Sequence, residues 1–165
     1  MKHLILSLFT LLAVSHAAAD YSRDYLDTAA VRTADSEGTS ITYRVFNESD
    51  TNPKLLLVMG LGGAGSAWGD AFIQNIESQG FEIIVIDNRD TGGSDLFTDW
   101  GTPTVWWQIL KYELGFSVDA PYTLDDMASD SIAVLDAEGH EQAHVMGVSI
   151  CLLYTSPSPR DKRLS

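Results

Sequence analysis

The sequence predicts an α/β fold, in which a mostly parallel sheet is flanked by helices. Two continuous apolar runs, residues 54–59 and 81–87, are typical of strands that are covered on both faces. Segments with apolar residues at helical spacing separate these runs from each other and from a further apolar run at residues 143–146. This alternation of strands and helices favours a sheet whose main strands run parallel.

A hairpin is expected before the first apolar run. Residues 39–46 are rich in β-branched and aromatic side chains and alternate in polarity, which predicts a strand. Residues 35–38, Asp-Ser-Glu-Gly, are a turn signal, so this strand is expected to pair with the segment around Val31.

The first helix is expected over residues 67–79. Gly80 suits its carboxyl end, because glycine commonly terminates helices. The apolar residues that recur at helical spacing and predict its buried stripe are Trp68, Phe72 and Ile76.

A later helix is predicted to begin at Thr123, because Thr123 and Asp126 match a capping box, and to end at Gly139. The carboxylates Asp125, Asp126 and Asp130 are expected to face solvent. The apolar residues expected to share the buried face are Leu124, Met127, Ala128, Ile132 and Leu135.

An aromatic-rich segment, residues 95–122, precedes this helix. It is expected to hold a short helix between Pro103 and Leu114. Its Trp106 and Trp107 are candidates for the wall of an acyl pocket, although paired tryptophans more often serve packing.

The two ends of the chain differ in composition from the middle. Residues 1–19 combine a charged start, a short apolar run and small residues, the pattern of a cleaved secretory signal peptide. We therefore expect export to the periplasm or the extracellular space, without a stable membrane anchor. Residues 151–165 hold Pro157 and Pro159 where a helix should start, and they resemble a translated adapter sequence. The globular domain is therefore expected to span residues 20–150.

The charge of the chain excludes some partners. The formal net charge is −13 at pH 7, and a field of this sign repels phosphate backbones and anionic lipids. Nucleic acid is therefore a poor partner. Cys151 is the only cysteine, so no disulfide can form within the chain.

The glycine-rich turn at residues 60–65 is open to more than one interpretation. It matches Gly-x-Gly-x-x-Gly between a strand and a helix, and Asp87 closes the next strand, as in a dinucleotide site with its ribose-binding acid. Against an NAD(P)-binding oxidoreductase, Trp68 lies where a pyrophosphate needs close approach, and residues 39–46 put antiparallel strand material before the loop. A non-catalytic secreted domain is a third interpretation.

A serine after the last predicted strand indicates a different chemistry. The apolar run at residues 143–146 stops at Gly147-Val148-Ser149, as when a buried strand delivers a nucleophile to a sharp turn before a helix. Position 151 holds cysteine where the full motif Gly-x-Ser-x-Gly has its second glycine.

Together these features resemble the α/β-hydrolase superfamily, especially the branch of serine esterases near aclacinomycin methylesterase. The resemblance implies the N-terminal half of that fold, with Ser149 as nucleophile and the backbone N–H groups of Leu61 and Ile150 as the oxyanion hole. It implies a small-molecule ester as substrate and no metal or organic cofactor. Dehalogenases and epoxide hydrolases of this superfamily use aspartate at the serine position. The stretches that carry the resemblance are residues 55–62, 86–94, 120–128 and 143–149.

The resemblance also implies that the triad acid and histidine follow the serine in the chain. His140 and His144 precede Ser149, so they are expected to be structural or surface residues. Asp87, Arg89 and Asp90 are expected to brace the turn after their strand, which is favoured over a contact with substrate. Because a serine without its base is a weak nucleophile, the 165-residue chain is expected to be inactive as an esterase.

Overall fold

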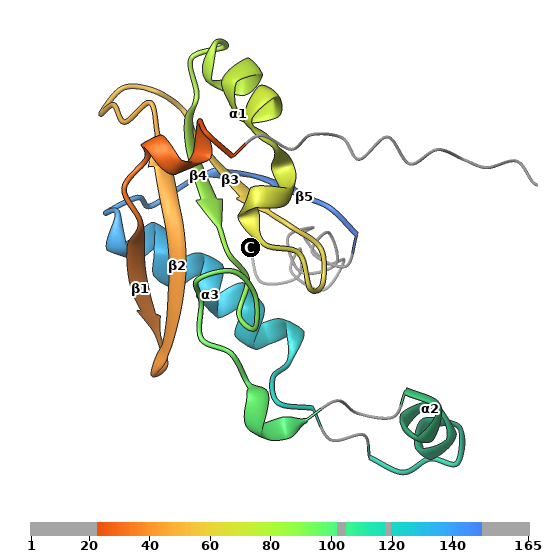
Figure 1. The fold of residues 1–165 in the computed structure, drawn as a ribbon. Coiled ribbons are helices and arrows are strands. Elements are labelled where there is room, and N and C mark those ends of the chain that lie inside the picture. Colours follow the sequence, from red (N-terminus) through yellow and green to blue (C-terminus); the bar gives the residue numbers. More distant parts are fainter. Residues whose placement is uncertain (1–22, 102–104, 118–119, 150–165) are drawn as a thin grey trace, which may run out of the picture.

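The computed structural model describes residues 23–101, 105–117 and 120–149, which form one five-stranded sheet with helices on both faces (Figure 1). The strands are β1 (Arg32–Ser36), β2 (Thr39–Phe46), β3 (Lys54–Val58), β4 (Glu82–Ile86) and β5 (His144–Gly147). Their order across the sheet is β1-β2-β4-β3-β5. β2 pairs antiparallel with β1 and β4, whereas β3 pairs parallel with β4 and β5. All strands except β2 therefore run in one direction, which confirms the mostly parallel sheet.

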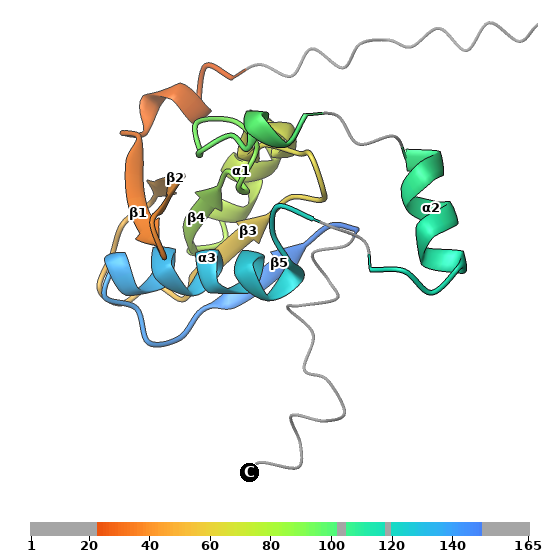
Figure 2. The same cartoon turned by 90° about the horizontal axis from the view of Figure 1, so that it is seen from below.

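The helices lie on both faces of the sheet. Among the described residues, the α-helices are α1 (Asp70–Glu77), α2 (Val105–Glu113) and α3 (Leu124–Ala137). Short 3₁₀ turns are η1 (Leu26–Thr28), η2 (Gly65–Trp68) and η3 (Thr98–Trp100). α1 and α3 cover opposite faces of the sheet, whereas α2 stands away from it in both views (Figures 1 and 2).

The predicted hairpin is present, and β2 has the predicted bounds. Ser36 pairs with Thr39, so Glu37 and Gly38 form a two-residue turn. Their φ angles of 53° and 87° are both positive, as in the hairpin turns whose twist matches that of the strands.

Two apolar cores hold the layers together. Leu55 of β3 belongs to the cluster that contains Ile73 and Ile76 of α1. Leu56, the next residue, belongs to the cluster on the opposite face, which contains Val134 of α3. Successive side chains of one strand thus reach different layers, which explains why the strand is continuously apolar.

α1 is shorter than predicted and buries a different stripe. Gly69, with a φ of 76°, separates η2 from α1, so Trp68 lies outside the helix. Phe72 is 36% exposed, and the ring of Trp68 stacks on it with centroids 5.0 Å apart. Ile76 enters the core as predicted, together with Ile73, and Trp68 packs against the same core from outside the helix. The predicted burial of Phe72 is wrong, because a turn and not continuous helix connects Trp68 to α1.

The predicted capping box of α3 is confirmed, and Met127 is buried as predicted, but other parts of the predicted buried face are wrong. The N–H of Asp126 donates to Thr123 Oγ1 (3.2 Å), and the N–H of Thr123 donates to Asp126 Oδ2 (2.6 Å). Ile132 is 59% exposed, however. The helix is rotated because Asp130 forms an ion pair inside the protein with Arg89. The residues that α3 buries are Met127, Asp130, Ser131 and Val134.

β5 lies at the edge of the sheet and is not buried as its apolar sequence predicts. Among the described residues it pairs only with β3. Val145 and Met146 are consequently 42% and 39% exposed. An exposed apolar edge of this kind favours association with other strands.

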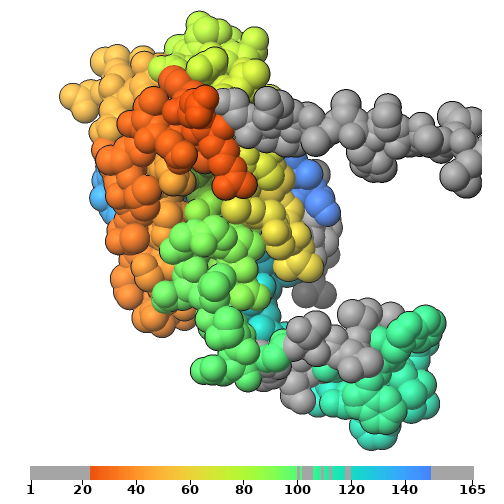
Figure 3. Space-filling model, viewed as in Figure 1, coloured from red at the N-terminus to blue at the C-terminus, as the bar shows by residue number. Residues whose placement is uncertain are grey.

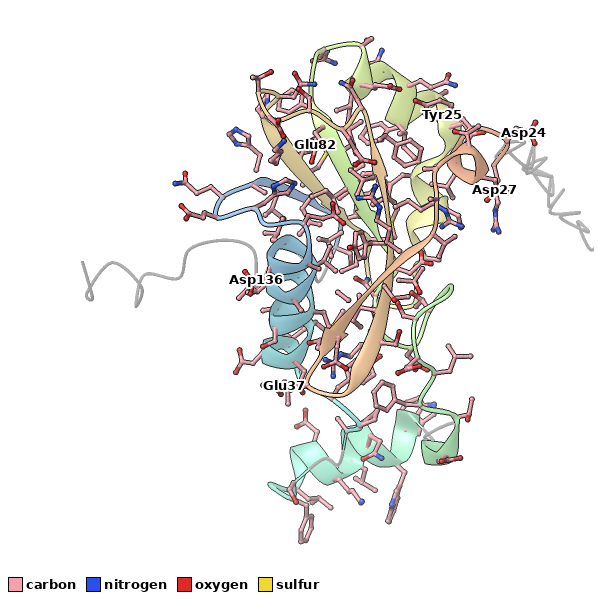
Figure 4. All side chains as sticks on the ribbon, turned by 90° about the vertical axis from the view of Figure 1, so that its left-hand side faces the viewer. Asp24, Tyr25, Asp27, Glu37, Glu82 and Asp136 are labelled. Atoms are coloured by element: carbon pink, nitrogen blue, oxygen red, sulfur yellow. The ribbon has the colours of Figure 1, made fainter. Side chains whose placement is uncertain are left out.

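The buried carboxylate of Glu82 connects three segments at the end of the sheet where β4 begins. Glu82 accepts hydrogen bonds from Lys54 Nζ (2.7 Å) and from the Ser49 N–H (2.7 Å), and its other oxygen lies 2.8 Å from His140 Nε2. Glu82 is labelled in Figure 4. Burial by itself raises the pKa of Glu82, but the hydrogen bonds from these neighbours outweigh it and hold the pKa below the ordinary value of 4.5.

We expect Glu82 to make the fold sensitive to acid. Because its folded pKa is lowered, its stabilisation is present above the ordinary value of 4.5 and is lost as the pH falls through the lower folded pKa. Glu82→Gln should lower the free energy of unfolding at pH 7 by about 1–3 kcal/mol. It should also flatten the acid limb of a plot of urea midpoint against pH.

The exposed Glu37, in the β1–β2 turn, offers a matched control for this measurement, since Glu37→Gln removes the same charge (Figure 4). An acid limb that is as steep in Glu82→Gln as in the original chain would contradict the assignment.

Several predictions concern segments at the margins of the fold. The signal peptide (residues 1–19), Ile150 and the tail (residues 151–165) lie outside the described residues. The helix expected between Pro103 and Leu114 is present as α2. None of the helices in the described part of the chain combines the length and apolar character needed to cross a membrane.

Candidate active site

Ser149 lies immediately beyond the end of β5. The N–H of Val148 still donates to the carbonyl of Val58 in β3 (3.2 Å). Ser149 then adopts a φ of 61° and is exposed to solvent. A residue with a side chain in this left-handed region stores about 1–3 kcal/mol of strain, so its surroundings must hold it there. A strained serine between a strand and the following turn is the geometry of a nucleophile elbow.

The glycine-rich loop after β3 approaches this serine. A Cβ atom placed on Gly60 would lie 3.1 Å from Ser149 Cβ and 3.3 Å from the Val148 carbonyl oxygen. A residue without a side chain is what permits so close an approach. Leu61 follows directly, and its N–H makes no hydrogen bond to any described residue. The loop thus carries an unused donor beside the residue that contacts Ser149.

The loop is held in shape by a tight turn and by Asn88, which follows β4. The N–H of Gly63 donates to the Gly60 carbonyl (2.9 Å), and Gly62 has a φ of 72°. The side-chain amide of Asn88 donates to the Met59 carbonyl (2.6 Å). A loop fixed in this way needs little rearrangement when charge develops beside it, which is the requirement for an oxyanion site.

Asp87 closes β4 and braces the loop from the other side. Its Oδ1 accepts a hydrogen bond from the Gly65 N–H (2.7 Å) and its Oδ2 accepts one from the Gly93 N–H (3.0 Å). A Cβ on Gly65 would lie 2.5 Å from Val85 Cγ1, so this glycine permits packing against the sheet. Both carboxylate oxygens are used by backbone N–H groups, which favours the predicted bracing role over a ribose contact.

Known proteins resemble this chain in sequence and in fold. The chain is 32% identical over 96 residues to a rhodomycin D methylesterase from Streptomyces sp. (strain C5), across 58% of this chain and 26% of that protein. An esterase from Rhodococcus sp. ECU1013 superposes with a TM-score of 0.55 at 25% identity, over 75% of this chain and 38% of that one. Epoxide hydrolase A from Mycobacterium thermoresistibile superposes with a TM-score of 0.55 at 19% identity, over 76% and 33%. No protein-family model matches the chain.

These superpositions decide the fold. The chain has the α/β-hydrolase fold. The predicted fold class and family resemblance are thereby confirmed. The matched region spans 26% of the length of each of two curated rhodomycin D methylesterases.

Within this fold, an ion pair between Arg89 and Asp130 fixes the turn after β4. Arg89 donates to Asp130 through Nε (2.7 Å) and through a terminal nitrogen (2.6 Å), and their side chains are only 7% and 3% exposed. The guanidinium also lies 5.5 Å from the ring centroid of Tyr122. The hydrogen bonds and charge of Asp130 raise the pKa of Arg89, although burial opposes this.

This ion pair corrects the expectation that Asp130 faces solvent, while the bracing role expected of Arg89 is present. A signal for it exists in the sequence: Asp130 lies at helical spacing from Met127 and Val134, which are both buried. An acid on an apolar face needs a cation, and Arg89 is that cation.

The tryptophans of α2 do not form an enclosed pocket among the described residues. Trp106 is 81% exposed and Trp107 is 58% exposed. Trp107 instead lines a shallow hollow together with Leu110, Leu114 and Phe116, which are also exposed. The structure therefore does not bring these side chains to Ser149.

Both histidines near β5 have the structural roles that were predicted. His140 contacts Glu82 at the far end of the sheet, and the ring of His144 meets Phe81 edge-on at 6.2 Å. Neither lies after Ser149, where the fold supplies a catalytic base. Among the described residues, no cluster of histidine, cysteine and carboxylate side chains is suited to hold a metal ion.

Proposed function

We propose that this α/β-hydrolase cleaves carboxylic esters of small molecules, with Ser149 as the nucleophile. The observation that carries the proposal is the position of Ser149, which follows β5 with a φ of 61° and contacts Gly60 of the loop after β3. The similarity to a methylesterase and to an esterase of known structure supports it. A serine at this position also favours ester chemistry over the aspartate-dependent opening of epoxides.

In the proposed reaction, Ser149 Oγ attacks the carbonyl carbon of the ester, and the carbonyl oxygen becomes an oxyanion. The N–H groups of Leu61 and Ile150 would donate hydrogen bonds to this oxyanion. The alcohol then leaves, and water releases the acid from the acyl-serine. All four histidines of the sequence precede Ser149, so the base that activates it would come from chain beyond these 165 residues.

We also propose that the protein is exported. The charged start, apolar run and small residues of positions 1–19 support a cleaved signal peptide.

The 165-residue chain is expected to hydrolyse p-nitrophenyl acetate no faster than its Ser149→Ala variant, because the serine lacks a base. A spectrophotometric assay of residues 20–165 measures this directly. Turnover that disappears in Ser149→Ala would show that the chain already contains its base, and the proposed mechanism would then be wrong.

The nucleophile itself is tested in the protein encoded by genomic DNA that continues across the codons for Ile150 and Cys151. There, Ser149→Ala should lower kcat/KM by about a million-fold, the scale of losing a triad serine. Leu61→Ala keeps the backbone N–H and should stay within about tenfold of the unmodified enzyme. Retention of activity in Ser149→Ala would overturn the proposal.

A further inference from the structure

A second cavity, of about 350 Å³, lies behind the glycine-rich loop. Its walls come from η1, β2, the loop and the turn after β4, which meet on one face of the molecule (Figure 3). Ala64 and Ser66 of the loop line it, so it shares a segment with the Ser149 site without containing Ser149. The charged residues in its walls are Arg23, Asp27, Arg44 and Asp87.

Arg44 lies in this cavity without a close partner. Its Nε is buried and has no hydrogen-bond partner among the described residues. The nearest carboxylate oxygen is Oδ1 of Asp27 on η1, which lies 3.7 Å from a terminal nitrogen of Arg44, beyond hydrogen-bond distance. Asp27 is labelled in Figure 4. The side chain is only 18% exposed, so water replaces few of the missing bonds. A guanidinium whose buried Nε donor is unused is costly to the fold unless an acceptor reaches it.

Two other partly buried cations of the described chain, Lys54 and Arg89, are closely paired. Lys54 lies 2.7 Å from Glu82, and Arg89 lies 2.6 Å from Asp130. The side chain of Arg23, in contrast, makes no hydrogen bond or ion pair with the described residues, although its carbonyl accepts one from the Asp27 N–H (2.9 Å), and it lines the same cavity as Arg44. In a chain with a net charge of −13, two under-paired arginines thus share one hollow.

We propose that this cavity binds a small monocarboxylate. Arginine donors match the two oxygens of a carboxylate, which accepts hydrogen bonds from a guanidinium pairwise. The walls also hold the carboxylates of Asp27 and Asp87, which repel a doubly charged anion more strongly than a singly charged one. The volume accommodates an anion of the size of acetate with water around it. The proposal does not depend on ester hydrolysis at Ser149.

The test is a titration of the 165-residue chain with 13C-labelled acetate, followed by line broadening, with sodium chloride holding the ionic strength constant. Saturable broadening is expected in the original chain and in Ser149→Ala. Arg44→Gln and the exposed variant Arg23→Gln should each weaken binding by about tenfold. Lys111→Gln, which removes one positive charge on α2, should leave it unchanged.

Several outcomes would overturn the proposal. These are the absence of saturable broadening, equal broadening in Arg23→Gln and the original chain, or loss of broadening in Ser149→Ala, which would assign acetate to the catalytic serine. Displacement of acetate by inorganic phosphate at a concentration lower than that of the acetate would contradict the preference for a singly charged anion. Because Arg23 is exposed, Arg23→Gln is expected to fold, and the test therefore gives a result even when Arg44→Gln does not fold.

Discussion

Asp130→Asn is expected to lower the free energy of unfolding by about 3 kcal/mol, because it leaves the buried guanidinium of Arg89 without its counter-charge. The two side chains are 7% and 3% exposed, so water cannot take over the role of the carboxylate. Arg89 also donates to the Asp126 carbonyl of α3 (3.2 Å). The ion pair therefore joins the turn after β4 to the helix on the opposite side of the sheet from α1. Urea unfolding followed by circular dichroism measures the effect.

Asp136→Asn is the matched control for this prediction. Asp136 lies on the exposed side of the same helix (Figure 4). Its substitution removes the same charge and should change the free energy of unfolding by less than about 0.5 kcal/mol. Equal destabilisation by the two variants would show that the charge of α3 matters and the buried pair does not.

Asp87→Ala is expected to lower the free energy of unfolding by about 2–6 kcal/mol, since it leaves two backbone N–H donors without an acceptor at about 1–3 kcal/mol each. The donors are the N–H groups of Gly65 and Gly93, which reach separate oxygens of the carboxylate at 2.7 and 3.0 Å. Asp87→Asn keeps one acceptor oxygen and should lose about half as much. Asp50→Ala, in the exposed loop between β2 and β3, serves as the control.

Asp87→Ala also distinguishes a hydrolase from the alternative of an NAD(P)-binding protein. If Asp87 braced the loop only, the original chain would show no saturable binding of NAD by fluorescence titration, and Asp87→Ala would act on stability alone. Saturable NAD binding that Asp87→Ala weakens, with unchanged stability, would contradict the role assigned to this carboxylate.

The elements that the sequence predicted well are those specified by neighbouring residues. The hairpin, the capping box at Thr123 and the bounds of β2 depend on side chains a few positions apart, and all are present. The continuously apolar sequences of strands β3 and β4 also predict burial on both faces, and this prediction does not require knowing which elements cover them.

The candidate site was predictable in part for the same reason. Gly147-Val148-Ser149 after an apolar run indicates a strand-to-turn serine, and the glycine content of residues 60–65 indicates a loop that other groups approach closely. Which residue of the loop meets Ser149 depended on the pairing of β3 with β5, and the structure shows it to be Gly60.

By itself, then, the sequence determined the order and type of the main elements, the capped start of α3 and the serine at the end of β5. Only the tertiary structure decided which faces of α1 and α3 are buried, that Asp130 is paired with Arg89, that both oxygens of Asp87 are occupied, and that β5 is an exposed edge. The physical reason is that periodicity and capping act over a few residues. The rotation of a helix and the pairing of a buried charge are instead set by side chains that are distant in the chain and meet only after the sheet has formed.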